Sequence, residues 1–137
     1  MKSMRVTMMS VSLLGLAALL AGCSSSGTTY SALDREAESE DDLPGVVVQG
    51  GGDVAVDTAR FVGEHDGVSL WLARAERPDT VCLVVYPNDQ EWVTGCGAEG
   101  GPIGVGGPAG DYVLIPDGAP APENSSQLTD NVYVVTD

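Results

Sequence analysis

The sequence is poor in basic residues: six Lys and Arg stand against 20 Asp and Glu, a formal net charge of −14. Binding to nucleic acid depends on clustered Lys and Arg that displace counterions, so this balance argues against a nucleic-acid partner. It also argues against a polybasic patch that attaches to anionic lipid. A single histidine leaves little material for a His-based triad or for a metal site with several His ligands.

Catalytic and cofactor motifs are also missing. There is no G-x-S-x-G nucleophile elbow and no D-x-[DN]-x-[DN]-G calcium loop. Gly104–Ala109 matches G-x-G-x-x-A, but it lacks the strand and helix that flank a dinucleotide site. We interpret the glycine-rich stretch 95–110 as a long flexible loop, and His65 in His65-Asp66-Gly67 as an exposed turn residue. We expect no cofactor, no metal and no catalytic site.

The N-terminal residues have the pattern of an export signal. Lys2 and Arg5 form a short positive region, and residues 6–21 are uncharged and mostly apolar. About 16 helical residues span roughly 24 Å, which is less than the ~30 Å hydrocarbon layer of a bilayer. A charged start, a short apolar stretch and small residues at its end indicate a signal peptide rather than a transmembrane helix.

The end of this stretch, Leu20-Ala21-Gly22-Cys23, resembles the lipobox of bacterial lipoproteins at all four positions. The resemblance implies transfer of diacylglycerol to the Cys23 sulfur and cleavage before Cys23. It implies a protein lipid-anchored on the extracytoplasmic face of the cell membrane. The Lys-poor composition, rich in Ala, Gly, Val and Asp, resembles that of small actinobacterial envelope lipoproteins. The segment 61–96 also resembles extracytoplasmic domains of actinobacterial membrane proteins, a resemblance that implies no activity.

The chain divides into three parts on these grounds: a signal peptide over residues 1–22, a lipidated acidic tether over residues 23–52, and a small domain over residues 53–137. Removal of Lys2 and Arg5 leaves four arginines against 20 acidic residues, a charge of −16. The tether is Gly- and Ser-rich and acidic, so we expect it to be disordered. Residues 33–40 are a candidate transient helix, and Val46-Val47-Val48 a candidate edge strand.

With Cys23 lipidated, Cys82 and Cys96 remain as a pair in an oxidising compartment, which favours a disulfide. Strand-like runs over 80–86 and 91–96 flank a turn-forming Pro87–Gln90. If Cys82 faces Cys96, then Val84 faces Thr94, and Tyr86 faces Trp92 in an aromatic cross-strand contact.

The domain is predicted to be mainly β, a small antiparallel sheet or a curled meander or barrel of five to six strands stapled by one disulfide. Residues 60–64 and 68–73 flank Asp66-Gly67, a favoured hairpin turn. Further strands are expected at 111–115 and 131–135. Asp57 is alternatively the cap of a short helix.

The sequence favours a role as a non-catalytic interaction or binding module of the cell envelope. Its partners are the membrane, through Cys23, and an envelope protein or wall polymer. Two alternatives stay open: a carboxylate-based hydrolase of wall polymers, and a wall-sugar-binding module. Trp71, Trp92 and Tyr86 are the candidate binding surface for the last, since aromatic rings stack on sugars and peptides.

Overall fold

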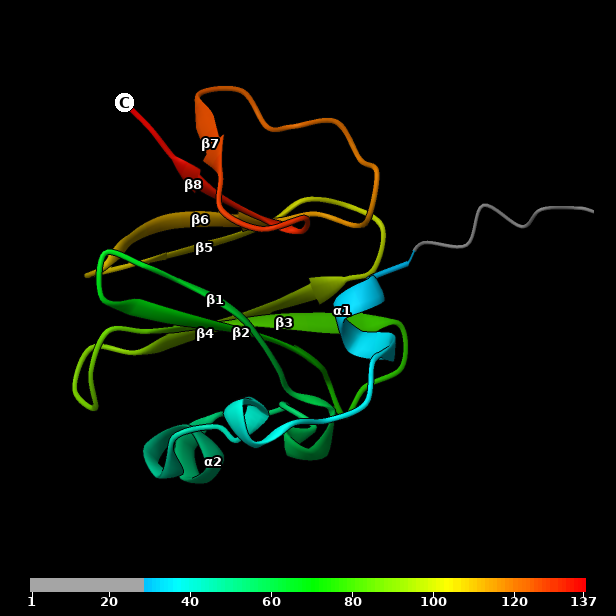
Figure 1. Cartoon of the computed structure of the whole chain (residues 1–137), viewed down its shortest axis with the longest axis vertical. Coiled ribbons are helices and arrows are strands. Elements are labelled where there is room, and N and C mark those ends of the chain that lie inside the picture. The colour runs from blue at the N-terminus through cyan, green and yellow to red at the C-terminus, as the bar shows by residue number, and fades with distance from the viewer. Residues whose placement is uncertain (1–28) are drawn as a thin grey trace, which may run out of the picture.

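The computed structural model describes residues 29–137. It confirms a mainly β, antiparallel architecture, but with eight strands in two four-stranded sheets rather than one sheet or barrel of five or six strands. The two sheets lie one above the other in Figure 1. The strands are β1 (Arg60–His65), β2 (Val68–Arg74), β3 (Thr80–Tyr86), β4 (Val93–Ala98), β5 (Ile103–Gly107), β6 (Gly110–Leu114), β7 (Ser125–Gln127) and β8 (Val132–Val135).

The first sheet is a meander in the order β1-β2-β3-β4. The predicted hairpin between β1 and β2 is confirmed: Asp66 and Gly67 both have positive φ, 48° and 77°, as a tight hairpin turn requires. The strand register pairs His65 with Val68 beside this turn.

The predicted disulfide is also confirmed. Cys82 and Cys96 are bonded and lie directly opposite each other on β3 and β4, and Val84 faces Thr94 as expected. The ladder ends at Val85 and Val93, one pair before the expected contact of Tyr86 with Trp92. Tyr86 is the last residue of β3, whereas Trp92 precedes β4 and belongs to the connection over residues 87–92.

The second sheet has the order β5-β6-β8-β7. The prediction of a flexible loop over residues 95–110 is wrong, since this stretch forms most of β4, all of β5 and the start of β6. Packing between the sheets explains the two glycines of β4, Gly95 and Gly97. A Cβ on Gly95 would lie 2.5 Å from Cγ2 of Val105, and one on Gly97 would lie 2.9 Å from Cγ1 of Ile103. Glycine on β4 therefore lets the side chains of β5 pack directly on its backbone.

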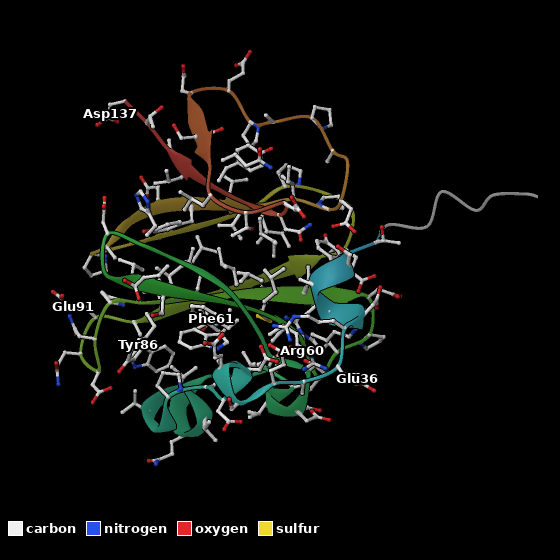
Figure 2. The ribbon with its side chains drawn as sticks, in the orientation of Figure 1. Glu36, Arg60, Phe61, Tyr86, Glu91 and Asp137 are labelled. Carbon is white, nitrogen blue, oxygen red and sulfur yellow. A yellow bond between two sulfur atoms is a disulfide. The ribbon has the colours of Figure 1, made fainter. Side chains whose placement is uncertain are left out.

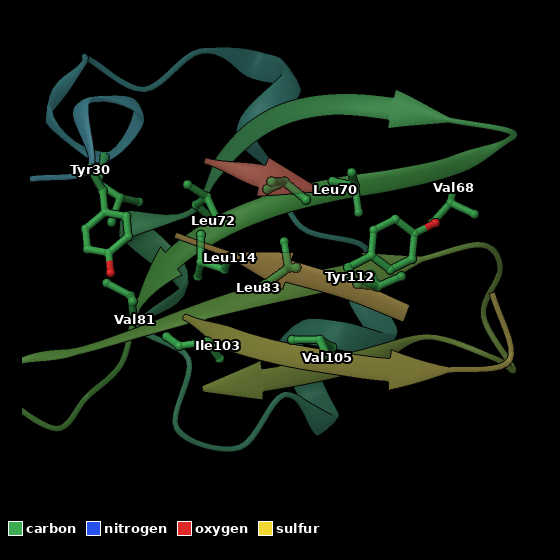
Figure 3. Close-up of a cluster of buried hydrophobic side chains, with 13 residues drawn as sticks. Tyr30, Val68, Leu70, Leu72, Val81, Leu83, Ile103, Val105, Tyr112 and Leu114 are labelled. Atoms are coloured by element: carbon green, nitrogen blue, oxygen red, sulfur yellow. The ribbon is translucent and has the colours of Figure 1, made fainter. Parts of the chain in front are cut away.

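The main core lies between the sheets (Figure 3). Alternate residues of β2 and β3 supply one side of it, and β5, β6 and β8 supply the other. Its fully buried members include Leu70, Leu83, Leu114 and Val132. Tyr30 closes one end of this core and is only 2% exposed.

A second cluster covers the opposite face of the first sheet. Trp71, Ala73, Cys82 and Val84 project there and are buried beneath Leu43 and Val47. These two covering residues come from the N-terminal segment, residues 29–52, which contains α1 (Ser31–Asp34), η1 (Ser39–Asp41) and α2 (Gly45–Gly50). In Figure 1, α2 lies on the side of this sheet that faces away from the second sheet.

The prediction of a disordered tether is therefore wrong for residues 29–52, which pack on the domain through Tyr30, Leu33, Leu43 and Val47. Val46–Val48 belong to a helix, not an edge strand. The short helix near Asp57 is η2 (Val56–Thr58), and Ala55 rather than Asp57 is its N-cap residue. Among residues 29–137, no helix is long and apolar enough to span a membrane.

Candidate functional site

The candidate sites depend on how the N-terminal segment is fastened to β1. Arg35 and Asp41 form a bidentate ion pair, with Nη1 donating to Oδ2 at 2.7 Å and Nη2 to Oδ1 at 2.6 Å. The Asp41 carboxylate also accepts the backbone N–H of Glu38 at 2.6 Å and that of Phe61 at 2.7 Å. Arg35 donates in addition to the Phe61 carbonyl at 3.1 Å. Two residues of the segment thus satisfy both backbone groups of Phe61 on β1.

We call the Arg35–Asp41 pair and its hydrogen bonds to Phe61 the clamp. Electrostatics at the clamp favour the ionised form of the Asp41 carboxylate. The side chain of Asp41 is 4% exposed. The Arg35 guanidinium lowers the pKa of Asp41 well below its usual range; burial opposes this shift, while the N–H groups of Glu38 and Phe61 reinforce it. Arg35 and Asp41 are therefore a structural pair and not an acid or base available for chemistry.

The predicted aromatic surface of Trp71, Trp92 and Tyr86 does not exist as one platform. Trp71 is 6% exposed, and its ring meets Phe61 and Tyr86 edge-on at centroid distances of 5.3 and 6.2 Å. Its Nε1 donates to the Glu40 carbonyl at 3.2 Å, so Trp71 belongs to the core under the N-terminal segment. Figure 2 shows Phe61 and Tyr86 on the side of the sheet that faces α2.

Tyr86 and Trp92 are half-buried at the margin of the same face. The Tyr86 hydroxyl donates to Asp89, and this hydrogen bond raises the pKa of Tyr86. Trp92 lies against Gly50, where a Cβ would be 3.2 Å from Cζ2 of the ring. A shallow pocket of about 590 Å³ opens beside Trp92, bounded by residues 50–53 and 92–94 and by Cys96.

The other sequence candidates are scattered. His65, expected to be an exposed turn residue, is instead the half-buried last residue of β1, and its Nε2 lies 3.3 Å from Oδ2 of Asp66. In the region from Thr29 to the C-terminus, no three His, Cys, Asp or Glu side chains are placed to hold a metal ion. Cys23 and the predicted signal peptide, residues 1–22, lie outside the described residues.

A groove that the sequence did not indicate lies between the N-terminal segment and η2. We call it the acidic groove; it encloses about 400 Å³. Val48 is 47% exposed and Val56 is 40% exposed, and these are two of the three exposed large hydrophobic residues in the described part of the chain. Its lining consists of apolar side chains and carboxylates, from Ala37, Glu38, Asp41, Asp42, Leu43, Val48, Val56, Asp57 and Ala59.

Carboxylates outnumber the arginines at this groove, and among residues 29–137 no ion pair joins an arginine to Glu38, Asp42 or Asp57. Glu38, Asp42 and Asp57 are exposed there. Arg35 and Arg60 lie beside the groove: Arg35 pairs with the lining residue Asp41, and Arg60 donates to the carbonyl groups of Arg35, Asp57 and Ala59. The other two arginines of residues 29–137 form ion pairs with other carboxylates, Arg74 with Glu99 and Asp34, and Arg77 with Asp53.

An apolar floor with an acidic rim suits a protein segment that carries both an aliphatic side chain and Lys or Arg. In the sequence, the signs of this groove are only indirect. Leu43 and residues 46–48 are apolar within an acidic stretch, and β3 is apolar at almost every position, as strands buried on both faces are. Comparison with protein-family models, curated proteins and solved structures finds no match for this chain.

Proposed function

We propose that this chain is an extracytoplasmic lipoprotein, anchored through Cys23, whose domain is a non-catalytic docking module for a protein partner with a basic segment. The observation that carries the docking role is the acidic groove. Val48 and Val56 expose apolar surface within one groove, whose lining also includes the exposed carboxylates of Glu38, Asp42 and Asp57. The Leu20–Cys23 resemblance carries the anchor.

The partner's chemistry follows from the groove. An aliphatic side chain of the partner would pack on the two valines, and its Lys or Arg would approach the rim carboxylates. Exposed charge pairs add little affinity individually but increase the rate of association, which falls as salt rises. We therefore expect docking that weakens with ionic strength.

The test uses the full-length chain expressed in an envelope-bearing host, with a photo-crosslinking residue at position 48. The matched control places it at Val135, which is 40% exposed but lies at the end of β8. The proposal expects an adduct at position 48 and not at 135, with mass spectrometry locating it in a Lys- or Arg-containing segment. Charge reversal of Glu38, Asp42 and Asp57 to Lys should abolish the adduct. An adduct that survives this reversal, or one to an acidic segment, would refute docking by charge complementarity.

The anchor is tested separately. Labelled acyl chains should appear on the wild-type chain and not on Cys23→Ala, and inhibition of lipoprotein processing should leave the precursor uncleaved. Absence of label in the wild type would remove the lipoprotein assignment.

The Trp92 pocket favours one second candidate, a site for wall sugars. Its half-buried ring could stack on a pyranose, and backbone carbonyl groups at the C-terminal end of α2 could accept sugar hydroxyls. Addition of muropeptides should then change tryptophan fluorescence in the wild type and in Tyr86→Phe, but not in Trp92→Phe. No change in the wild type would exclude the sugar site.

A further inference from the structure

The length of chain between the proposed anchor and the folded domain restricts where a partner can be. The domain begins at Thr29, whose carbonyl accepts the N–H of Asp117 at 2.9 Å. Ser31 donates its N–H to Oδ2 of Asp117 at 2.8 Å. Asn131 holds the other Asp117 oxygen at 2.7 Å. Tyr30 is buried, and its hydroxyl accepts the Gly100 N–H at 3.2 Å.

These contacts hold residues 29–31 to the β4–β5 turn, through Gly100, and to the loop between β6 and β7, through Asp117, so these residues do not act as additional tether. Only residues 24–28 separate Cys23 from Thr29. Six Cα–Cα steps can span at most about 22 Å when fully extended. A domain of about 100 residues has a radius of gyration near 13 Å, and therefore a diameter of about 30 Å.

The spacer is thus shorter than the domain it holds. Whatever conformation residues 24–28 adopt, covalent geometry keeps every part of the domain within about 55 Å of the lipid headgroups. A free tether to residue 52 would span at most about five times that length when fully extended. The lipid surface itself is a poor ligand, because a domain with 20 acidic residues and four arginines is repelled by anionic headgroups.

We infer that the occupant of the acidic groove is a basic extracytoplasmic segment of a protein held in the same membrane. This rests on the proposed anchor at Cys23. Confinement of both proteins to one thin layer raises their effective concentration, so a shallow groove with modest intrinsic affinity is sufficient. A partner confined to distal wall polymer would lie beyond the reach of the groove.

The experiment changes the distance between the domain and the membrane and keeps the proposed lipid anchor at Cys23. Two full-length variants carry an insertion of about 40 residues between Gly27 and Thr28. In one the insertion is a helical EAAAK repeat, which lifts the domain by about 60 Å; in the other it is a flexible Gly-Ser repeat of equal length. Both carry the photo-crosslinking residue at position 48, and acylation of Cys23 is measured on each.

The inference expects the helical spacer to reduce the adduct about tenfold or more, because it prevents simultaneous engagement of membrane and partner. The flexible spacer allows the domain to return to the surface and should reduce it less than about threefold. The crosslinked partner should require detergent for extraction. Equal adduct yields from the two acylated variants, or a partner released by wall digestion alone, would overturn the inference while leaving the anchor and docking role intact. Lack of acylation would overturn the anchor and the inference together.

Discussion

Replacement of Asp41 by Asn should detach the N-terminal segment from the first sheet. The carboxylate accepts four hydrogen bonds, two from Arg35 and one each from the N–H groups of Glu38 and Phe61. An amide of nearly the same shape retains one acceptor oxygen and presents an NH₂ to donors on the other side. It also leaves the partly buried Arg35 guanidinium without its counter-ion.

The magnitude follows from the burial of this pair. Removing one partner of a buried ion pair costs about 3–5 kcal/mol, because the other charge is left unpaired. Arg35 is 35% exposed and water can reach part of its guanidinium, which places the expected loss at about 3 kcal/mol. This is a large share of the 5–15 kcal/mol that stabilises an ordinary domain.

Urea unfolding followed by tryptophan fluorescence measures this loss, with the disulfide intact. Trp71 is a suitable reporter because its Nε1 donates to the Glu40 carbonyl, one residue from the altered side chain. The control is Asp42→Asn, which removes the same charge from an adjacent exposed side chain and should change stability by less than about 0.5 kcal/mol. If both variants lose the same stability, the loss reflects net charge and the clamp argument is refuted.

The same pair predicts a pH dependence of defined sign. The pKa of Asp41 is lower in the folded chain than in the unfolded chain, where a carboxyl titrates near about 3.9. The stabilisation is therefore complete above this value and is lost as pH falls toward the folded-state pKa. The difference in unfolding free energy between wild type and Asp41→Asn should shrink below about pH 4. A difference that stays constant from neutral pH to pH 3 would contradict this assignment.

Three further changes test the packing, each by urea unfolding. Thr94→Val should raise the free energy of unfolding by about 1 kcal/mol, since the buried Thr94 hydroxyl has no hydrogen-bond partner in the described structure; a lower urea midpoint would contradict this. Gly95→Ala should cost about 1–3 kcal/mol, because its Cβ would meet Val105 at 2.5 Å. Gly104→Ala, whose Cβ meets nothing within 4 Å, is the control, and equal losses would refute the clash. Replacing Cys82 and Cys96 by Ser should cost about 3 kcal/mol, and an unchanged midpoint would show that the bond does not stabilise the fold.

Local rules were sufficient for the first sheet. The Asp66-Gly67 pair defines its own turn, and the β3–β4 register follows from one assumption about Cys82 and Cys96. These features depend on neighbours close in sequence, so composition and spacing contain the information.

The prediction for the glycine-rich stretch 95–110 was wrong because two of its glycines allow close packing against the other sheet. Composition indicates a loop wherever glycine is frequent, but Gly95 and Gly97 are needed to admit Val105 and Ile103. Only the partner strand reveals that requirement. A stretch with the same glycine content and no facing side chains would have been the loop that was expected.

The prediction that the N-terminal segment is disordered was wrong for a related reason. Its acidic composition indicates disorder when the segment is considered alone. Its few apolar residues are nevertheless sufficient, because they close an apolar face that β2 and β3 already present. The near-continuous apolar run of β3 is typical of a strand buried on both faces, but nothing in the local pattern of residues 29–52 identifies that segment as the cover of the second face.

Fastening of the segment and formation of the acidic groove are consequently one event. Leu43 is both a buried contact to the first sheet and part of the groove, and Asp41 joins the clamp to the groove wall. One side of the groove is formed by this segment and the other by Val56 and Asp57 of η2, so the groove is lost when the segment detaches. Local opening of the segment would then abolish docking while the disulfide-linked sheet stays folded. Asp41→Asn should therefore reduce the adduct at position 48 in urea concentrations that leave the first sheet intact, whereas Asp42→Asn, which removes one rim charge, should weaken docking without moving the unfolding transition.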